Sequence, residues 1–136
     1  MKYLSSNEED GVLLAEIRAR AMKASLEAVG RFDVERVRSR FLKGFISSEI
    51  IKVIDENELM GFNVVKEKSD CLYLDHLYID PKFQNKNIGT SVINRLKLQA
   101  KERQLPIRLG ALKESKSNNF YISHGFVKTH EGEFLL

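Results

Sequence analysis

The sequence predicts a mixed α/β fold with a mostly antiparallel sheet of six to seven strands and about four helices on both faces. Segments typical of strands and segments with apolar residues at helical spacing alternate along the whole chain. Their order is strand, two helices, three strands, helix, strand, helix and two strands. The passage from Ile79 to Ile107 predicts a right-handed crossover between parallel strands, and the remaining strands are expected to be antiparallel.

The N-terminal part is expected to hold a short strand, Lys2–Leu4, and a first helix. Ser6 with Glu9, or Ser5 with Glu8, has the spacing of a helix capping box. Apolar residues then recur at helical spacing at Leu13, Leu14, Ile17, Ala21 and Ala24.

Gly30 ends the first helix, and Asp33 is placed to cap a second, shorter one. One stripe of this second helix carries Val34, Val37, Phe41 and Leu42. Three strands then follow as an antiparallel meander: Ile50–Ile54, Leu59–Lys66 and Cys71–Ile79.

The C-terminal part begins with a long helix from Ile88 to about Gln104. One face of this helix carries Ile88, Val92, Ile93, Leu96 and Ala100. A strand over Ile107–Leu112 and a short helix over Ser117–His124 follow, and Gly125 lies in the usual position after a helix end. Phe126–His130 and Glu133–Leu136 are expected to form a final hairpin.

The composition indicates a single soluble domain over residues 1–136. No apolar run approaches the roughly 18 residues that span a bilayer. The net charge of +3 is too small to indicate a nucleic-acid partner. Cys71 is the only cysteine, so no internal disulfide is possible and a reducing, cytoplasmic location is expected.

The stretch Leu77–Thr90 is the most informative part of the chain. A strand ends, a polar loop follows and a helix begins, and the first turn of a helix offers unpaired backbone N–H groups to phosphates. Asn87 is well suited to a positive φ, Gly89 allows close approach to the backbone, and Lys86 adds a cation. The stretch is neither a Walker A loop nor Gly-x-Gly-x-x-Gly. On these residues alone, an ordinary polar loop explains it equally well.

Two segments resemble the GNAT superfamily of acyl-CoA-dependent N-acyltransferases. Gln84-Asn85-Lys86-Asn87-Ile88-Gly89, preceded by Leu77-Tyr78-Ile79-Asp80-Pro81, is similar to the family's pyrophosphate motif Gln/Arg-x-x-Gly-x-Gly/Ala. Phe120-Tyr121-Ile122-Ser123-His124-Gly125-Phe126 resembles its Phe-Tyr-x-x-x-Gly-Phe segment. The chain departs from the family at Asn87, where Gly is usual, and at Glu114 and Ser117, which replace an Asn-x-x-Ala.

The resemblance implies acetyl-CoA as co-substrate and direct attack of a primary amine on the thioester. No metal is expected, because His124 and His130 have no metal-ligand spacing with other His or Cys residues. The backbone of Leu77, Tyr78 and Ile79 is then expected to bind the pantetheine like an added strand. The pyrophosphate is expected to contact the main-chain N–H groups of Gln84, Asn85, Lys86, Asn87, Ile88, Gly89 and Thr90.

Tyr121 is the candidate general acid, since a phenol can donate a proton to the leaving thiolate. The candidate bases are Asp75 and His76 on the strand leading into the site, with Tyr73 and nearby glutamates left open. A packed tyrosine and a structural histidine are the competing interpretations of Tyr121 and His76.

The leading interpretation is an N-acetyltransferase; the alternative is a non-catalytic acyl-CoA-binding module for sensing or assembly. The amine acceptor, a small molecule or a protein amine, is left open, as are the acyl-chain preference and the oligomeric state, for which a homodimer is one option. Neither a nucleic acid nor a membrane is expected as a partner.

Overall fold

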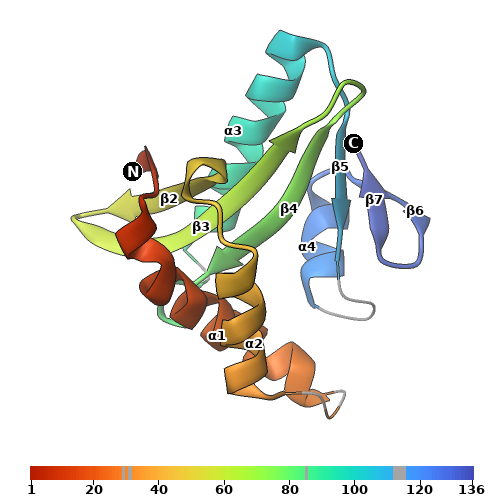
Figure 1. Cartoon of the computed structure of the whole chain (residues 1–136). Coiled ribbons are helices and arrows are strands. Elements are labelled where there is room, and N and C mark those ends of the chain that lie inside the picture. The colour runs from red at the N-terminus through yellow and green to blue at the C-terminus, as the bar shows by residue number, and fades with distance from the viewer. Residues whose placement is uncertain (29, 31, 85, 112–115) are drawn as a thin grey trace. The chain divides into compact units, whose positions relative to one another are not determined.

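The computed structural model describes residues 1–28, 30, 32–84, 86–111 and 116–136 and shows the mixed α/β fold that the sequence predicts (Figure 1). Seven strands are hydrogen-bonded in the order β1-β2-β3-β4-β5-β7-β6. The chain forms two compact units: Met1–Val64 with His76–Lys86, and Val65–Asp75 with Asn87–Leu136. Strands β3 and β4 pass through both units, which are described separately below.

In the first unit, β1 (Lys2–Ser5) pairs antiparallel with β2 (Ile50–Asp55), and β2 pairs antiparallel with β3 (Glu58–Glu67). Glu56 and Asn57 connect β2 to β3 with φ values of 51° and 65°. Two consecutive left-handed residues are typical of the tight turn whose twist matches that of a hairpin.

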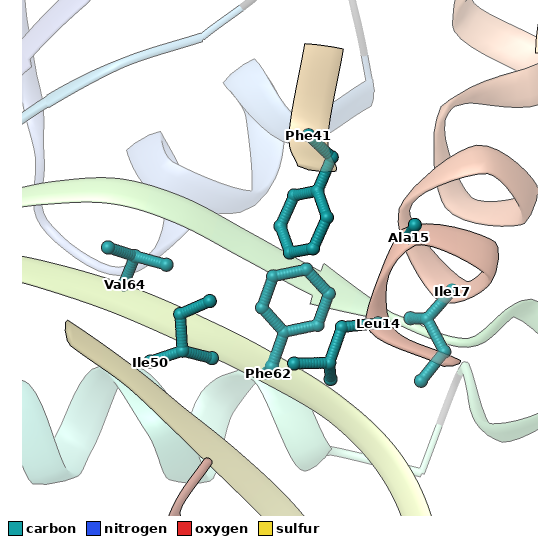
Figure 2. Close-up of a cluster of buried hydrophobic side chains, with 7 residues drawn as sticks. All are labelled: Leu14, Ala15, Ile17, Phe41, Ile50, Phe62 and Val64. Carbon is teal, nitrogen blue, oxygen red and sulfur yellow. The ribbon is translucent and has the colours of Figure 1, made fainter. Parts of the chain in front are cut away.

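Helices α1 (Gly11–Ala28) and α2 (Val34–Lys43) supply the apolar residues that cover these strands. Figure 2 shows the resulting core, formed by Leu14, Ala15, Ile17, Phe41, Ile50, Phe62 and Val64. Phe62 is fully buried, and its ring centroid lies 5.4 Å from that of Phe41 and 5.5 Å from that of Tyr78. As predicted, Asp33 caps α2 by accepting a hydrogen bond from the Arg36 N–H.

The predicted cap and apolar stripe of the first helix are partly wrong. The short helix η1 (Glu8–Asp10) precedes α1, and the capping box joins Asn7 to Asp10. The Ser6 hydroxyl lies away from this cap and donates to the Ser47 carbonyl at 2.7 Å. Leu13, which was expected on the apolar stripe, is 60% exposed, whereas the adjacent Leu14 is fully buried.

In the second unit, β4 (Leu72–Ile79) pairs in parallel with β5 (Ile107–Gly110), as the predicted crossover requires. The connecting helix α3 (Ile88–Arg103) buries the whole predicted apolar face: Ile88, Val92, Ile93, Leu96 and Ala100. β5 ends two residues before the predicted Leu112, which lies outside the described residues.

The chain ends with α4 (Lys116–Ser123) and the hairpin of β6 (Val127–His130) and β7 (Glu133–Leu135). β7 returns to pair antiparallel with β5. Gly125 follows α4 with a φ of 94°, a conformation that favours glycine. Two further short helices are η2 (Ser47–Glu49) and η3 (Pro81–Phe83). None of the helices in the described part of the chain is long and apolar enough to cross a membrane.

Candidate functional site

The candidate site begins on the C-terminal half of β4. Within the described residues, the ladder between β4 and β5 covers Leu72–Leu74, whereas β4 continues to Ile79. On the β3 side the approach is tight, because a Cβ at Gly61 would lie 2.3 Å from the Tyr78 carbonyl oxygen. Leu77 and Ile79 therefore lie in a part of β4 that continues past its pairing with β5. That is the geometry an added, strand-like ligand requires.

Asp80 fixes the point where β4 ends and the loop begins. Its N–H donates to the Met60 carbonyl at 2.8 Å, and its side chain caps η3 by accepting a hydrogen bond from the Lys82 N–H. The carboxylate is buried and forms an ion pair with Arg20 of α1, with Nη2 and Oδ2 2.7 Å apart. Neither the cap nor the ion pair of Asp80 was predicted from the sequence. The Asp-Pro pair is a recognisable cap signal, because proline is favoured at the first helical position.

The loop between η3 and α3 presents polar side chains. Gln84 is exposed, and its Nε2 donates to the Ile79 carbonyl at 3.2 Å, which joins the loop to the end of β4. The Lys86 side chain is also exposed, with its ammonium 5.7 Å from the centre of the Phe83 ring. Asn85, a predicted pyrophosphate contact, lies outside the described residues.

Asn87 begins α3 in the left-handed conformation, with φ 61° and ψ 21°, as expected from its residue type. Its carbonyl accepts the first helical hydrogen bond, from the Ser91 N–H at 3.1 Å. The N–H groups of Ile88, Gly89 and Thr90 therefore have no acceptor within the helix. This turn can bind a pyrophosphate, since N–H groups and the positive end of the helix dipole favour an anion.

The two sequence motifs meet in the second unit. A Cβ at Gly89 would lie 3.1 Å from Cζ of Phe120, so the absence of a side chain there lets α4 pack on the first turn of α3. Next to this contact, Thr90 Oγ1 lies 3.0 Å from His124 Nε2. Packing within the protein thus explains Gly89 independently of any ligand. Sequence analysis did not predict this contact.

Tyr121, the candidate acid, is a buried residue of α4. Its ring centroid lies 5.4 Å from that of Phe120, 5.6 Å from that of Phe126 and 6.1 Å from that of Phe134. The ring is therefore fixed by aromatic contacts on several sides, which limits the positions that its hydroxyl group can take.

The two candidate bases have different partners. Asp75 in the second unit forms an ion pair with Lys66, with Oδ2 and Nζ 3.6 Å apart. In the first unit, His76 Nδ1 lies 3.1 Å from the Tyr78 hydroxyl oxygen. Alternate residues of a strand lie on the same side of the sheet, which places His76 and Tyr78 together on one side of β4. Cys71 is buried, and burial raises the pKa of its thiol, which argues against a nucleophilic role.

Comparisons with known proteins identify the family and the fold. A family model described as an acetyltransferase (GNAT) domain matches residues 20–135. Among solved structures, the chain is similar to the PaiA N-acetyltransferase of Thermoplasma acidophilum in complex with coenzyme A. The TM-score is 0.82 at 19% identity, over 98% of this chain and 95% of that one.

Two further solved structures have the same fold. An N-acetyltransferase of Staphylococcus aureus Mu50 has a TM-score of 0.72 at 12% identity, over 99% of this chain and 97% of that one. A GNAT family acetyltransferase of Elizabethkingia anophelis with acetyl-CoA bound has a TM-score of 0.52 at 22% identity, over 60% of this chain and 55% of that one. No sufficiently similar relative was found among curated protein sequences. The match of the family model over most of the chain shows that this protein belongs to the GNAT acetyltransferases.

Proposed function

We propose that the chain transfers an acetyl group from acetyl-CoA to a primary amine, by direct attack of the amine in a ternary complex. The main support for this proposal is the left-handed backbone conformation of Asn87, where α3 begins directly after β4 and its loop. It supports a pyrophosphate site at the N–H groups of the first turn. No metal has a role in the proposed reaction, and the cytoplasmic location stays a prediction.

The residues of β4 and the loop are proposed to bind the co-substrate. The main chain of Leu77, Tyr78 and Ile79 would pair with the pantetheine amides, because β4 continues past its pairing with β5. Main-chain N–H groups over residues 84–90 would bind the pyrophosphate. When bound, acetyl-CoA supplies the acetyl group as a thioester.

Two proton transfers are proposed: one to the leaving thiolate and one from the attacking amine. Tyr121 would give its phenolic proton to the leaving thiolate, and the aromatic rings around it would hold the phenol in place. A primary amine of the lysine type is protonated at neutral pH, with a pKa of about 10.4, so it has to lose a proton before attack. Asp75 and His76 are the proposed acceptors of that proton.

Two measurements test this function. Acetyl-CoA at about 100 times its Kd is expected to stabilise the fold by about 2.7 kcal/mol. For a chain of this size that raises the Tm by roughly 8–12 °C. An unchanged Tm at saturating acetyl-CoA contradicts the co-substrate assignment.

Incubation with labelled acetyl-CoA and a panel of amines then separates catalysis from binding. A catalyst releases free CoA only when a suitable amine is present. The alternative, a non-catalytic acyl-CoA-binding module, predicts stabilisation without amine-dependent release. A panel of small amines, peptide N-termini and lysine peptides also tests whether the acceptor is a small molecule or a protein. Longer acyl-CoA thioesters in the same assay measure the acyl-chain preference.

A further inference from the structure

His124, the residue directly after α4, makes a polar contact with the helix turn that is proposed to bind the pyrophosphate. Its Nε2 lies 3.0 Å from Thr90 Oγ1, and its Nδ1 lies 2.9 Å from the Phe120 carbonyl oxygen. The ring centroids of His124 and Phe120 are 4.5 Å apart, and the Phe120 ring in turn packs against the position of Gly89. Nε2 therefore contacts α3 through Thr90, and Nδ1 contacts α4 through Phe120.

These contacts determine which nitrogen carries the proton of the neutral ring. Two groups lie near Nδ1: the Phe120 carbonyl oxygen, which can only accept, and the Ser123 hydroxyl at 3.1 Å, whose proton is already donated to that carbonyl. Nδ1 therefore carries the hydrogen and donates it to Phe120. Nε2 of the neutral ring is then an acceptor, and the Thr90 hydroxyl donates its single proton to it. In this state Thr90 presents only lone pairs to any further group at the first turn of α3.

A second proton on His124 reverses the direction of the contact. Nε2–H of the imidazolium donates to Thr90 Oγ1, and the Thr90 hydroxyl proton is then available to another acceptor. Within the described residues, the polar and ring contacts of His124 are with Thr90, Phe120 and Ser123, none of which is charged. No ion pair in this part of the chain therefore fixes the charge of the ring.

We propose that His124 is a positioning residue for the CoA pyrophosphate, because its protonation converts the Thr90 hydroxyl from an acceptor into a donor toward the phosphate oxygens. This inference depends on the proposed function of the α3 turn. An anion at the turn favours the protonated ring, both by its charge and by accepting the released hydroxyl proton. Binding and protonation are thus linked, and the complex takes up a proton.

The test measures the Kd of 3′-dephospho-CoA between pH 5.5 and pH 8.5. This probe keeps the pyrophosphate and removes the phosphate monoester, whose own second pKa of about 6 would obscure the result. If pyrophosphate binding raises the proton affinity of the ring tenfold, the Kd falls by up to about tenfold as the pH is lowered. Calorimetry in buffers of different ionisation enthalpy reports the proton uptake directly.

Two variants and one control assign the effect to this contact. His124→Gln removes the imidazole ring and is expected to flatten the pH profile. Thr90→Val removes the hydroxyl while keeping the main-chain N–H, and it is expected to reduce the pH dependence to the part that charge alone contributes. His130→Gln replaces a histidine of the β6–β7 hairpin whose side chain is 77% exposed, and it should keep the wild-type profile. Thermal unfolding shows whether each variant is folded. If either His124→Gln or Thr90→Val is unfolded, the pH profile of the other variant tests the proposal.

The outcomes separate this inference from the proposed function. A wild-type protein that binds 3′-dephospho-CoA with a flat pH profile overturns the inference and leaves the function intact. A wild-type protein that binds neither 3′-dephospho-CoA nor acetyl-CoA overturns both. A pH profile that persists in His124→Gln overturns the role of His124, and one that keeps its full wild-type magnitude in Thr90→Val overturns the role of the hydroxyl.

Discussion

The left-handed backbone at Asn87 allows a direct test of the pyrophosphate site by substitution. The Asn87 side chain makes no capping hydrogen bond, so its replacement changes the conformational preference of the backbone and little else. Left-handed geometry costs an ordinary residue about 1–2 kcal/mol, and a β-branched residue is a strong outlier there. Glycine has no such cost but loses about 0.5–1 kcal/mol more entropy on folding.

These magnitudes predict opposite effects for two variants. In Asn87→Gly the two glycine effects largely cancel, so we expect an unfolding free energy within about 0.5 kcal/mol of wild type and an equal or tighter Kd for acetyl-CoA. Asn87→Val should lose about 1–2 kcal/mol of stability. If its backbone leaves the left-handed region, the first-turn N–H groups change direction and the Kd should rise about tenfold, which is 1.4 kcal/mol.

Isothermal calorimetry and chemical unfolding measure the two quantities separately. Asn57→Val is the matched control, because Asn57 has a φ of 65° in the β2–β3 turn, which forms no part of the proposed site. It should show a similar stability loss with an unchanged Kd. Equal acetyl-CoA affinity in Asn87→Gly and Asn87→Val would refute the reasoning, since the backbone conformation would then be irrelevant to binding.

Three further predictions concern catalysis by Tyr121, the ion pair of Arg20 with Asp80, and stability in acid. Tyr121→Phe should lower kcat by about 10²-fold or somewhat less and leave acetyl-CoA affinity nearly unchanged; single-turnover rates at the wild-type level would remove the phenol from the mechanism. Arg20→Leu leaves a buried carboxylate without its cation. Because Arg20 itself is half-exposed, we expect the free energy of unfolding to fall by about 1–2 kcal/mol. Urea unfolding measures this loss, and Arg20→Lys, which keeps the positive charge, is the control. Burial raises the pKa of Asp10, but the Asn7 N–H and the Lys52 ammonium outweigh it, so the folded pKa lies below the ordinary value. The contribution of Asp10 to stability is therefore present at neutral pH and lost as the pH falls below about 4, and Asp10→Asn should unfold less steeply in acid; an unchanged acid transition contradicts this assignment.

Local signals predicted much of the fold correctly. The buried face of α3 agrees residue for residue with the predicted stripe, because a single helix face packs against one core. Asp33 caps α2 and Asn87 is left-handed for reasons that lie within a few residues of each. The β2–β3 hairpin likewise follows from the short polar turn between two apolar strands.

Contacts between distant residues were not predictable from the sequence in the same way. Arg20 and Asp80 are 60 residues apart, and Thr90 and His124 are 34 apart. Neither pair has a spacing that marks it, since each exists only because the elements carrying the two residues pack together. The cap before α1 was also mispredicted: Asn7 and Asp10 form the capping box, and the Ser6 hydroxyl donates to the distant Ser47 carbonyl.

The contact between α3 and α4 shows why the two motifs act as one structural unit. The absence of a side chain at Gly89 makes room for the Phe120 ring. The Phe120 ring packs at a tilt against His124, which contacts the Thr90 hydroxyl. The next residue of α4 is Tyr121, so any shift of Phe120 also moves the candidate acid. The turn proposed to bind the pyrophosphate and the helix proposed to protonate the thiolate are therefore positioned by the same few contacts. A substitution at either end of this contact is expected to change both binding and catalysis, because the backbone of α4 cannot move for one residue without moving for the other.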